Sequence, residues 1–292
     1  MRNIFEIPVF HGEDGVKSYT KRDMLADDIF NAINSNRYSR DDPTNALSVK
    51  QNFFNPILNN KSIKLFGLWG GSKESEDNKA DEADIQTLDY LSKLKSNING
   101  KDFNFLEISL LFCDAHHIIC NGKSLKEVQT YYESLENLVN ERNLKILKLS
   151  ELLNLRDVDD FSKIKRILND PYSRKQTNLL FENLDYASKI IKATKKHSDF
   201  SRQYHPSELK YLAKLYVEME INFLRQIYYQ DYQKLFGMED PKNKGGLVYF
   251  SLSNPEIQKP IAEVAEVPML FFWAREGHHG EVPWYRSKNE QK

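Results

Sequence analysis

The sequence predicts an α/β fold built on a mostly parallel sheet with crossover helices. Two apolar segments, Ser62–Trp69 (SIKLFGLW) and Phe105–Cys113 (FLEISLLFC), each lead into a polar loop and then into a helical pattern. A third apolar run, Leu144–Leu149, follows the second helical pattern. Strand, loop and helix in repetition are typical of a parallel sheet. Ligands of such sheets bind beyond the carboxyl ends of the strands, where we expect the two polar loops to meet.

The first two parts of the chain are an N-terminal segment, residues 1–60, and a βαβαβ core, residues 61–150. The N-terminal segment is irregular and partly helical, with apolar residues at helical spacing across Asp23–Asn34, and we expect it to pack on the core. In the core, apolar residues recur at a spacing of three across Asp84–Leu94. A capping box of Ser124 and Glu127 begins the next helix. Right-handed crossovers place both helices on the faces of the sheet.

The remaining parts are a large helical insertion, residues 151–240, and a C-terminal part, residues 241–292. The predicted helices of the insertion are Phe161–Leu168, Thr177–Thr194 and Ser207–Leu235, the last beginning at His205-Pro206 and ending at Gly237. Strand patterns return at Leu247–Leu252 and Val267–Trp273, and we expect them to complete the same sheet. A polar tail follows, which we expect to reach the active site.

Composition limits the classes of function. With 292 residues, 40% hydrophobic content and a formal net charge of −1, the chain has ample core and no overall attraction to nucleic acid or anionic membrane. No apolar stretch approaches the roughly 18–20 residues that span a bilayer, and the acidic N-terminus does not resemble a signal peptide. Two cysteines are too few for a disulfide scaffold. We therefore expect a cytoplasmic protein with small-molecule substrates, and its oligomeric state stays open.

The loop after the first strand has the chemistry of an anion-binding site. Gly70 and Gly71 let backbone N–H groups approach an oxyanion, Ser72 adds a hydroxyl and Lys73 adds a positive charge. The spacing of a P-loop is absent. The loop therefore predicts a site for phosphate or carboxylate, with Lys73 as a catalytic residue. A plain structural turn is the alternative.

The loop after the second strand suggests acid–base chemistry. Asp114 and His116 directly follow a buried apolar run, and an aspartate beside an imidazole can raise its basicity, which suits a general base. If the segment stays extended, Asp114 and His116 share a side and His117 points the opposite way. The alternative is that Asp114 caps a turn while one histidine packs under the sheet edge.

A further cluster follows the last predicted strand, at Glu276–Glu281 (EGHHGE). Arg275 is a cation able to pair with a substrate carboxylate or phosphate, and we count His278 among the substrate-binding residues. Together with Asp114 and His116, the cluster offers histidine and carboxylate ligands, but no metal-binding spacing such as HExxH occurs. We therefore predict no metal.

The order of these features resembles that of the isonitrile synthases and the related dityrosine-biosynthesis proteins of fungi, over Lys61–Leu138. The matching elements are a strand ending in a lysine-bearing loop, an acidic helix start, a strand ending in an aspartate-led loop, a striped helix and a Pro-Trp element (Ile63–Lys73, Ala80–Leu88, Cys113–His117, Val128–Leu138 and Val282–Tyr285). The chain departs from the family where a Lys-Ser-Pro-Asn run is usual, because Glu74-Ser75-Glu76 follow Lys73. It also departs where a glycine usually follows the aspartate, because Ala115 stands there.

The resemblance implies a Rossmann-like fold and a specialised-metabolism enzyme, a transferase or lyase. Such enzymes convert the amino group of an aromatic amino acid to an isonitrile, with the carbon from a pentulose phosphate such as ribulose 5-phosphate and without a metal or nucleotide cofactor. Two alternatives stay open. One is another Rossmann-like transferase with an aminoacyl substrate, like the cyclodipeptide synthases. The other is a non-enzymatic binding or interaction protein whose sheet is only a scaffold.

Overall fold

The computed structural model describes residues 21–34, 39–59, 61–70, 79–99, 104–152, 170–197, 204–231 and 246–272. Within these residues, six strands form one sheet in the order β1-β6-β5-β2-β3-β4. The strands are β1 (Ser39–Thr44), β2 (Ile63–Trp69), β3 (Leu106–Phe112), β4 (Lys145–Lys148), β5 (Leu247–Ser251) and β6 (Met269–Phe272). All neighbouring pairs are parallel except β1 and β6. The predicted α/β fold with a mostly parallel sheet is confirmed, and the C-terminal strands extend the same sheet.

Helices cover both faces of the sheet. One face packs on α1 (Lys21–Ile33), α2 (Ala46–Leu58), α3 (Glu82–Ile98) and α5 (Leu125–Glu141). The other face packs on α8 (Pro171–Glu182), α9 (Leu184–His197), α10 (Pro206–Gln226) and α13 (Pro255–Ala265). Three short elements complete the described chain: α4 (Asp114–Ile119), α6 (Leu149–Leu152) and the π-helical turn η1 (Ile227–Asp231). Each face therefore has its own hydrophobic core.

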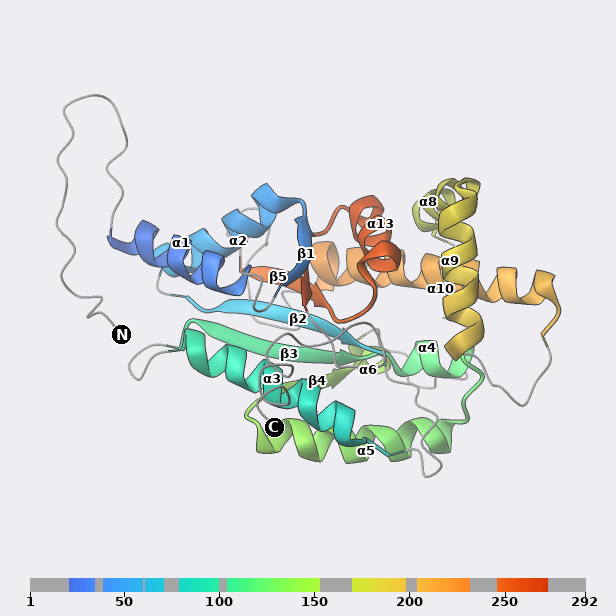
Figure 1. Ribbon diagram of the computed structural model, residues 1–292, viewed down its shortest axis with the longest axis horizontal. Helices are drawn as coiled ribbons and strands as arrows, with labels where there is room; N and C mark the ends of the chain where they lie inside the picture. Colours follow the sequence, from blue (N-terminus) through green and yellow to red (C-terminus); the bar gives the residue numbers. More distant parts are fainter. Residues whose placement is uncertain are drawn as a thin grey trace, which may run out of the picture.

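The sheet changes direction of growth between β2 and β5. From β2 the chain steps to β3 and β4 on one side, and from β5 it steps to β6 on the other. Right-handed crossovers then require α3 and α5 to lie on one face and α13 on the opposite face, as they do. In Figure 1, β2 and β3 run side by side from left to right and end near α4. Such a switch point is where α/β sheets bind ligands.

Gly67 lets β2 and β5 pack closely at this switch point. It is the register partner of Phe250, whose ring lies directly over the Gly67 Cα. A Cβ at position 67 would stand 2.1 Å from Phe250 Cζ. Phe250 is fully buried and stacks on Phe272, with 5.2 Å between the ring centroids. A side chain at position 67 would therefore displace a packed aromatic pair.

Local sequence signals explain several helix boundaries. The capping box of Ser124 and Glu127 begins α5 as predicted. Pro206 occupies the first turn of α10, and the His205 side chain accepts a hydrogen bond from the Ser207 N–H. The helix expected over Thr177–Thr194 is instead divided into α8 and α9, because Asn183 leaves helical geometry and its side chain accepts from the Tyr186 N–H (3.1 Å).

Other elements were not predicted from the sequence. β1, with Pro43 inside it, is an edge strand, the position at which a sheet tolerates proline. The helices α2, α4 and α13 were also missed. The predicted helix Phe161–Leu168 and the helix end at Gly237 lie outside the described residues.

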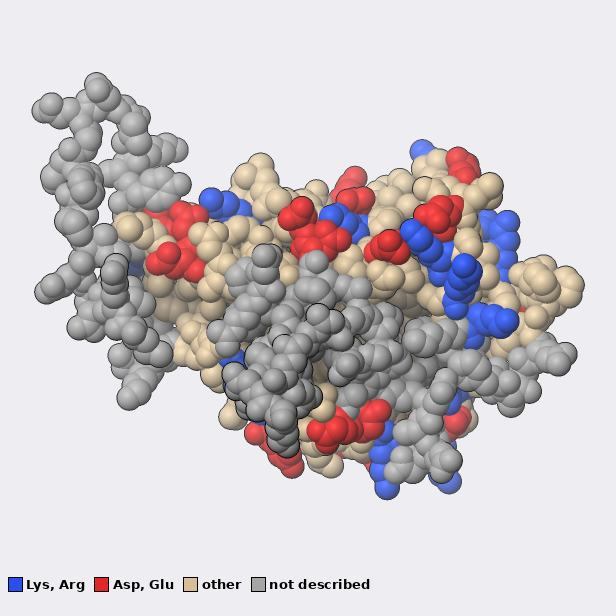
Figure 2. Space-filling model, viewed as in Figure 1, with Lys and Arg blue, Asp and Glu red and all other residues tan. Residues whose placement is uncertain are grey.

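The surface carries side chains of both charge signs. Figure 2 shows Lys and Arg side chains gathered over α9, and Lys192 and Lys195 on that helix are exposed. The opposite side of α9 is buried through Tyr186 and Ile190. Among the described residues, no helix has both the length and the apolar character that crossing a bilayer requires.

Candidate active site

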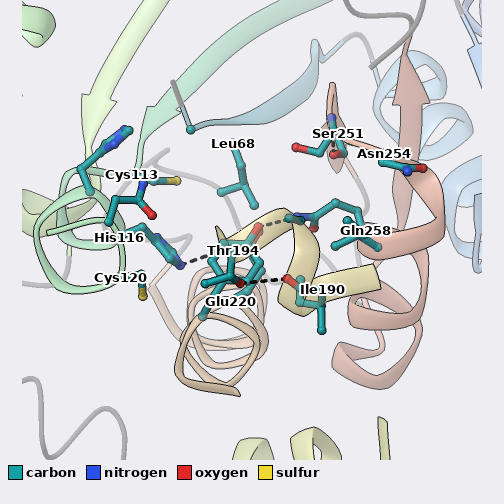
Figure 3. Close-up of a pocket in the computed structure, with 17 residues that line it drawn as sticks. Leu68, Cys113, His116, Cys120, Ile190, Thr194, Glu220, Ser251, Asn254 and Gln258 are labelled. Atoms are coloured by element: carbon teal, nitrogen blue, oxygen red, sulfur yellow. Dashed lines mark hydrogen bonds and ion pairs between the residues drawn. The ribbon is translucent and has the colours of Figure 1, made fainter. Parts of the chain in front are cut away.

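A cavity of about 110 Å³ lies at the carboxyl ends of β2, β3 and β5. Leu68 and Gly70 border it from β2, Cys113 from the end of β3, and Ser251 from β5. The helices α4, α9, α10 and α13, with the residues that follow α4 and precede α13, supply the rest of the wall (Figure 3). The register explains the convergence, because Trp69 is the partner of Phe112 and the two strands end level. The cavity therefore lies where the sequence placed the crevice.

The segment after β3 is helical, not extended. Cys113 caps α4, and its carbonyl accepts hydrogen bonds from the N–H groups of His116 (3.0 Å) and His117 (3.2 Å). Positions 113, 116, 117 and 120 then lie on one helical face. Cys113, His116, His117 and Cys120 accordingly all border the cavity. The side-chain alternation expected of an extended segment is wrong, and both histidines face the same space.

His116 meets a buried acidic residue from α10. Its Nε2 lies 3.2 Å from Oε2 of Glu220, and Figure 3 shows the two side chains pointing toward one another. His116 is 5% exposed and Glu220 is 2% exposed. The imidazole is held by aromatic neighbours, with ring centroids 5.4 Å from Tyr216 and 5.3 Å from Phe223. The pair is thus fixed in a low-dielectric setting, where charge interactions are strong.

Tyr216 and Gln258 lie beside this pair. Gln258, from α13, donates from Nε2 to the Tyr216 hydroxyl (2.7 Å). Burial raises the pKa of Tyr216 well above its usual value, and the negative charge of Glu220 raises it further. Tyr216 therefore stays a neutral hydroxyl.

Several buried polar atoms around the cavity have no hydrogen-bond partner in the protein. They include Glu220 Oε1, Gln258 Oε1 and both ring nitrogens of His116. The carboxylate and amide oxygens can only accept. Buried polar atoms are normally satisfied, so a cluster of open acceptors indicates a site for a donor. The arrangement suits a ligand that carries several N–H or O–H groups, and a cation more than an anion.

The charge of Glu220 reaches both cysteines. Burial raises the pKa of the Cys113 thiol well above its usual value, and Glu220 adds to the shift. The same two causes, in the same order, raise the pKa of Cys120 to about 12. Both cysteines are buried, and neither forms a disulfide. They consequently form a neutral wall rather than a thiolate nucleophile.

Asp114 is buried but engaged elsewhere. Its Oδ1 accepts from the N–H groups of Ala115 and Ser150, both at 3.0 Å, and its Oδ2 accepts a hydrogen bond from the Ser150 hydroxyl. Burial raises the pKa of Asp114, opposed first by the hydrogen bonds from Ser150. The residue joins α4 to the start of α6 and does not border the cavity, unlike its neighbour His116.

Of the remaining predicted site residues, one borders the cavity and the others are not among the described residues. Gly70 borders the cavity. Other predicted residues lie outside the described residues, and these are Gly71, Ser72, Lys73, Arg275 and His278. Among the residues that the structure describes, no group of three or more His, Cys, Asp or Glu side chains is arranged to hold a metal ion.

Sequence reasoning missed Glu220, Tyr216 and Gln258. A signal for Glu220 exists, because it stands in the buried stripe of α10 with Val217 and Leu224, where an apolar residue is the norm. Gln258 lacks such a signal, since its helix was not predicted.

Comparison with known proteins supports the fold. No protein-family model and no curated protein matches the sequence. Among solved structures, the PvcA protein from Pseudomonas aeruginosa is similar, with a TM-score of 0.57, 13% identity, and coverage of 86% of this chain and 83% of that chain. The chain thus shares its fold with PvcA, and the fold that the resemblance implied is confirmed.

Two weaker similarities were found. The tyrosyl-tRNA synthetase from Archaeoglobus fulgidus, complexed with L-tyrosine, has a TM-score of 0.44 at 11% identity over 85% of this chain and 64% of that chain. A CDPS from Fluoribacter dumoffii has a TM-score of 0.40 at 10% identity over 72% of this chain and 90% of that chain.

Proposed function

We propose that this chain is a small-molecule biosynthetic enzyme of the isonitrile-synthase kind. Its substrates are then an amino acid, aromatic by the family resemblance, and a sugar phosphate such as ribulose 5-phosphate. The fold shared with PvcA, an isonitrile synthase-like protein, supports the kinship. A cavity at the switch point of the sheet supports an enzyme rather than a scaffold.

One observation carries the proposal: a buried carboxylate with an open oxygen borders this cavity. Glu220 is 2% exposed, and its Oε1 has no partner in the protein. Gln258 adds a second open acceptor, because its amide nitrogen is already used by Tyr216. An ammonium group supplies both a positive charge and three donors. These acceptors therefore fit the amino group of an amino acid.

The lining of the cavity agrees with this ligand. Leu68, Ile190 and Ile257 give it an apolar side for the side chain of the amino acid. The sugar phosphate would then approach from the loop that begins at Gly70, where the sequence predicts the anion-binding residues.

The first step, imine formation, asks little of the protein beyond positioning and proton transfer. The isonitrile is reached only after both C–C bonds of the former carbonyl carbon have broken and the rest of the sugar phosphate has left. The amino nitrogen bonds to the carbonyl carbon of the sugar phosphate, and the carbonyl oxygen leaves as water together with two protons from the nitrogen. The amine attacks only after its ammonium form has lost a proton. His116 and Glu220 are the groups at the cavity that can exchange that proton.

The test is a thermal-shift screen followed by product analysis. Each proteinogenic amino acid is added to the purified protein, and those that raise the melting temperature are incubated with ribulose 5-phosphate. We expect the mass of the corresponding isonitrile. Glu220→Gln should lose both the thermal shift and the product. Glu218→Gln is the matched control, since Glu218 lies on the same helix and pairs with Arg174 (3.5 Å) away from the cavity.

The outcomes separate the candidate functions. Absence of any isonitrile from every amino acid that binds would contradict the reaction. Amino-acid binding without any product is the behaviour expected of the non-enzymatic alternative. No stabilisation by any amino acid would remove the amine site itself.

A further inference from the structure

The contact between His116 and Glu220 has a consequence for charge balance in the cavity. Among the described residues that border it, Glu220 is the acidic one, and none is Lys or Arg. If His116 is protonated, the pair is neutral, and an incoming ammonium adds an unbalanced buried positive charge. If His116 is neutral, Glu220 leaves the cavity negative and the ammonium balances it. An unbalanced buried charge is costly. A bound ammonium and a protonated His116 therefore exclude one another.

Among the described residues around the pair, none other is a base placed to take this role. The titratable groups packed around it are Cys113, Asp114, His117 and Cys120 from α4, Tyr186 from α9, Tyr216 from α10 and Tyr249 from β5. Burial raises the pKa of the two thiols and of the three phenols, with the charge of Glu220 adding to each shift, so these groups stay neutral. Asp114 is occupied by Ser150.

His117 differs from His116 in what it touches. Its ring stacks on Phe112, with 5.4 Å between centroids, and lies edge-on to Tyr131 at 6.4 Å. His116 instead has Nε2 3.2 Å from Oε2 of Glu220, and neither of its ring nitrogens has a hydrogen-bond partner. In the neutral ring, one nitrogen carries the proton and the other keeps a lone pair that can accept one. The two adjacent histidines thus border the same cavity but differ in their neighbours: His117 packs on aromatic rings, whereas His116 lies beside a carboxylate.

We propose that His116, the partner of Glu220, accepts the proton that the substrate's ammonium group loses. The protonated imidazole and the ammonium group alternate as the counter-ion of the Glu220 carboxylate. The inference rests on the proposed amine site. Binding of the ammonium expels the His116 proton to solvent. During reaction, one proton passes from the ammonium to the imidazole of His116, which gives a neutral amine and an imidazolium. The buried charge is unchanged by this transfer, because the positive charge moves from one partner of Glu220 to the other.

The proposal predicts proton release on amine binding. The probe is L-tyrosine, or the amino acid that gives the largest thermal shift, titrated calorimetrically in buffers of different ionisation enthalpy. In titrations between about pH 5 and 8, the wild-type protein should release up to one proton on binding. Because a proton is released, the dissociation constant should fall as the pH rises within this range, by up to about tenfold per pH unit. The deaminated analogue, 3-(4-hydroxyphenyl)propionate for tyrosine, should show neither effect.

Two variants make the test specific. His116→Gln keeps a donor toward Glu220 and cannot titrate, so its affinity should be flat over the same pH range. His117→Gln should retain the wild-type pH dependence. Melting curves establish that each variant is folded. The wild-type buffer comparison alone still decides the matter if His116→Gln does not fold.

Each outcome bears on one proposal. Binding without proton exchange, or the same pH dependence in His116→Gln, would overturn the role of His116, as would failure of every amino acid to bind. Proton release without isonitrile formation would remove only the reaction proposed above. Isonitrile formation with an unaltered pH profile of kcat in His116→Gln would keep the reaction and remove His116 from it.

Discussion

Two buried carboxylates near α4 show that burial alone does not mark a functional residue. Asp114 accepts hydrogen bonds from Ala115 and Ser150, so its oxygens are satisfied within the protein. Glu220 is buried to a similar degree but keeps one oxygen open toward a cavity. Counting hydrogen-bond partners separates an acid that joins two helices from one that keeps an oxygen open at a cavity.

Asp114 and Ser150 should be coupled in stability. Asp114→Ala leaves the Ser150 N–H and hydroxyl buried without an acceptor, so we expect it to lower the free energy of unfolding by about 1–3 kcal/mol. Ser150→Ala should cost less, because its backbone N–H still donates to Asp114. Urea unfolding of both single variants and the double variant measures the coupling. Additive effects would contradict a direct interaction.

Cys120 should make stability depend on alkaline pH. Its pKa is raised from 9.0 to about 12 by burial and by Glu220, so the folded protein retains a proton that the unfolded chain loses. That stabilising contribution is complete below pH 9 and is lost as the pH rises from about 9 to 12, at up to about 1.4 kcal/mol per pH unit. Cys120→Ala should therefore lose less stability than the wild type between pH 8 and 10 in denaturant titrations. An equal loss in both proteins would refute this assignment.

At the scale of elements, the sequence was sufficient where local pattern and tertiary environment agree. β2, β3 and β5 are buried apolar runs, so their own composition predicted them. β1 (SRDDPT) has no such pattern, because its conformation depends on pairing with β6 at the sheet edge. The Thr44 hydroxyl donates to the Val267 carbonyl (3.0 Å) and accepts from the Met269 N–H (3.1 Å). Such long-range contacts leave no local signature.

Gly67 should be required for the packing of β2 against β5. Gly67→Ala places a methyl group against the buried ring of Phe250, and we expect it to lower the free energy of unfolding by about 1–3 kcal/mol through overpacking. Gly70→Ala is the control for stability, since a Cβ there meets nothing within 4 Å. Thermal or urea unfolding of both variants is the measurement. An equal loss of stability in the two variants would show that the loss comes from restricted backbone freedom and not from the contact with Phe250.

The site illustrates the same limit at the scale of the whole molecule. His116 was predictable because it directly follows a strand end, where α/β enzymes place functional groups. Its partner Glu220 lies about a hundred positions later on a helix of the insertion, so only the folded chain brings the two together. The insertion thus supplies part of the cavity wall through α9 and α10. That the insertion contributes to the cavity could be recognised only from the structure.

The two cores of the molecule should respond differently to a ligand. The cavity is bordered by α4, α9, α10 and α13, whereas α1, α2 and α3 pack on the opposite core. A bound amino acid suppresses local opening of the elements that it touches. Under native conditions, hydrogen exchange should therefore slow in the first group of helices and stay unchanged in α1 and α2. Amides that exchange only through global unfolding are excluded from the comparison, since ligand binding slows them everywhere.

Glu220→Gln provides the control for this exchange experiment, because it removes the charge that we propose holds the ammonium while keeping the shape of the side chain. The same amino acid should then leave the exchange of α4, α9, α10 and α13 unaltered. Protection in the variant equal to that in the wild type would mean that the ligand does not bind through Glu220. Protection concentrated in α1 and α2 would place the ligand on the other face of the sheet, and the cavity at the switch point would lose its assignment as the amine site.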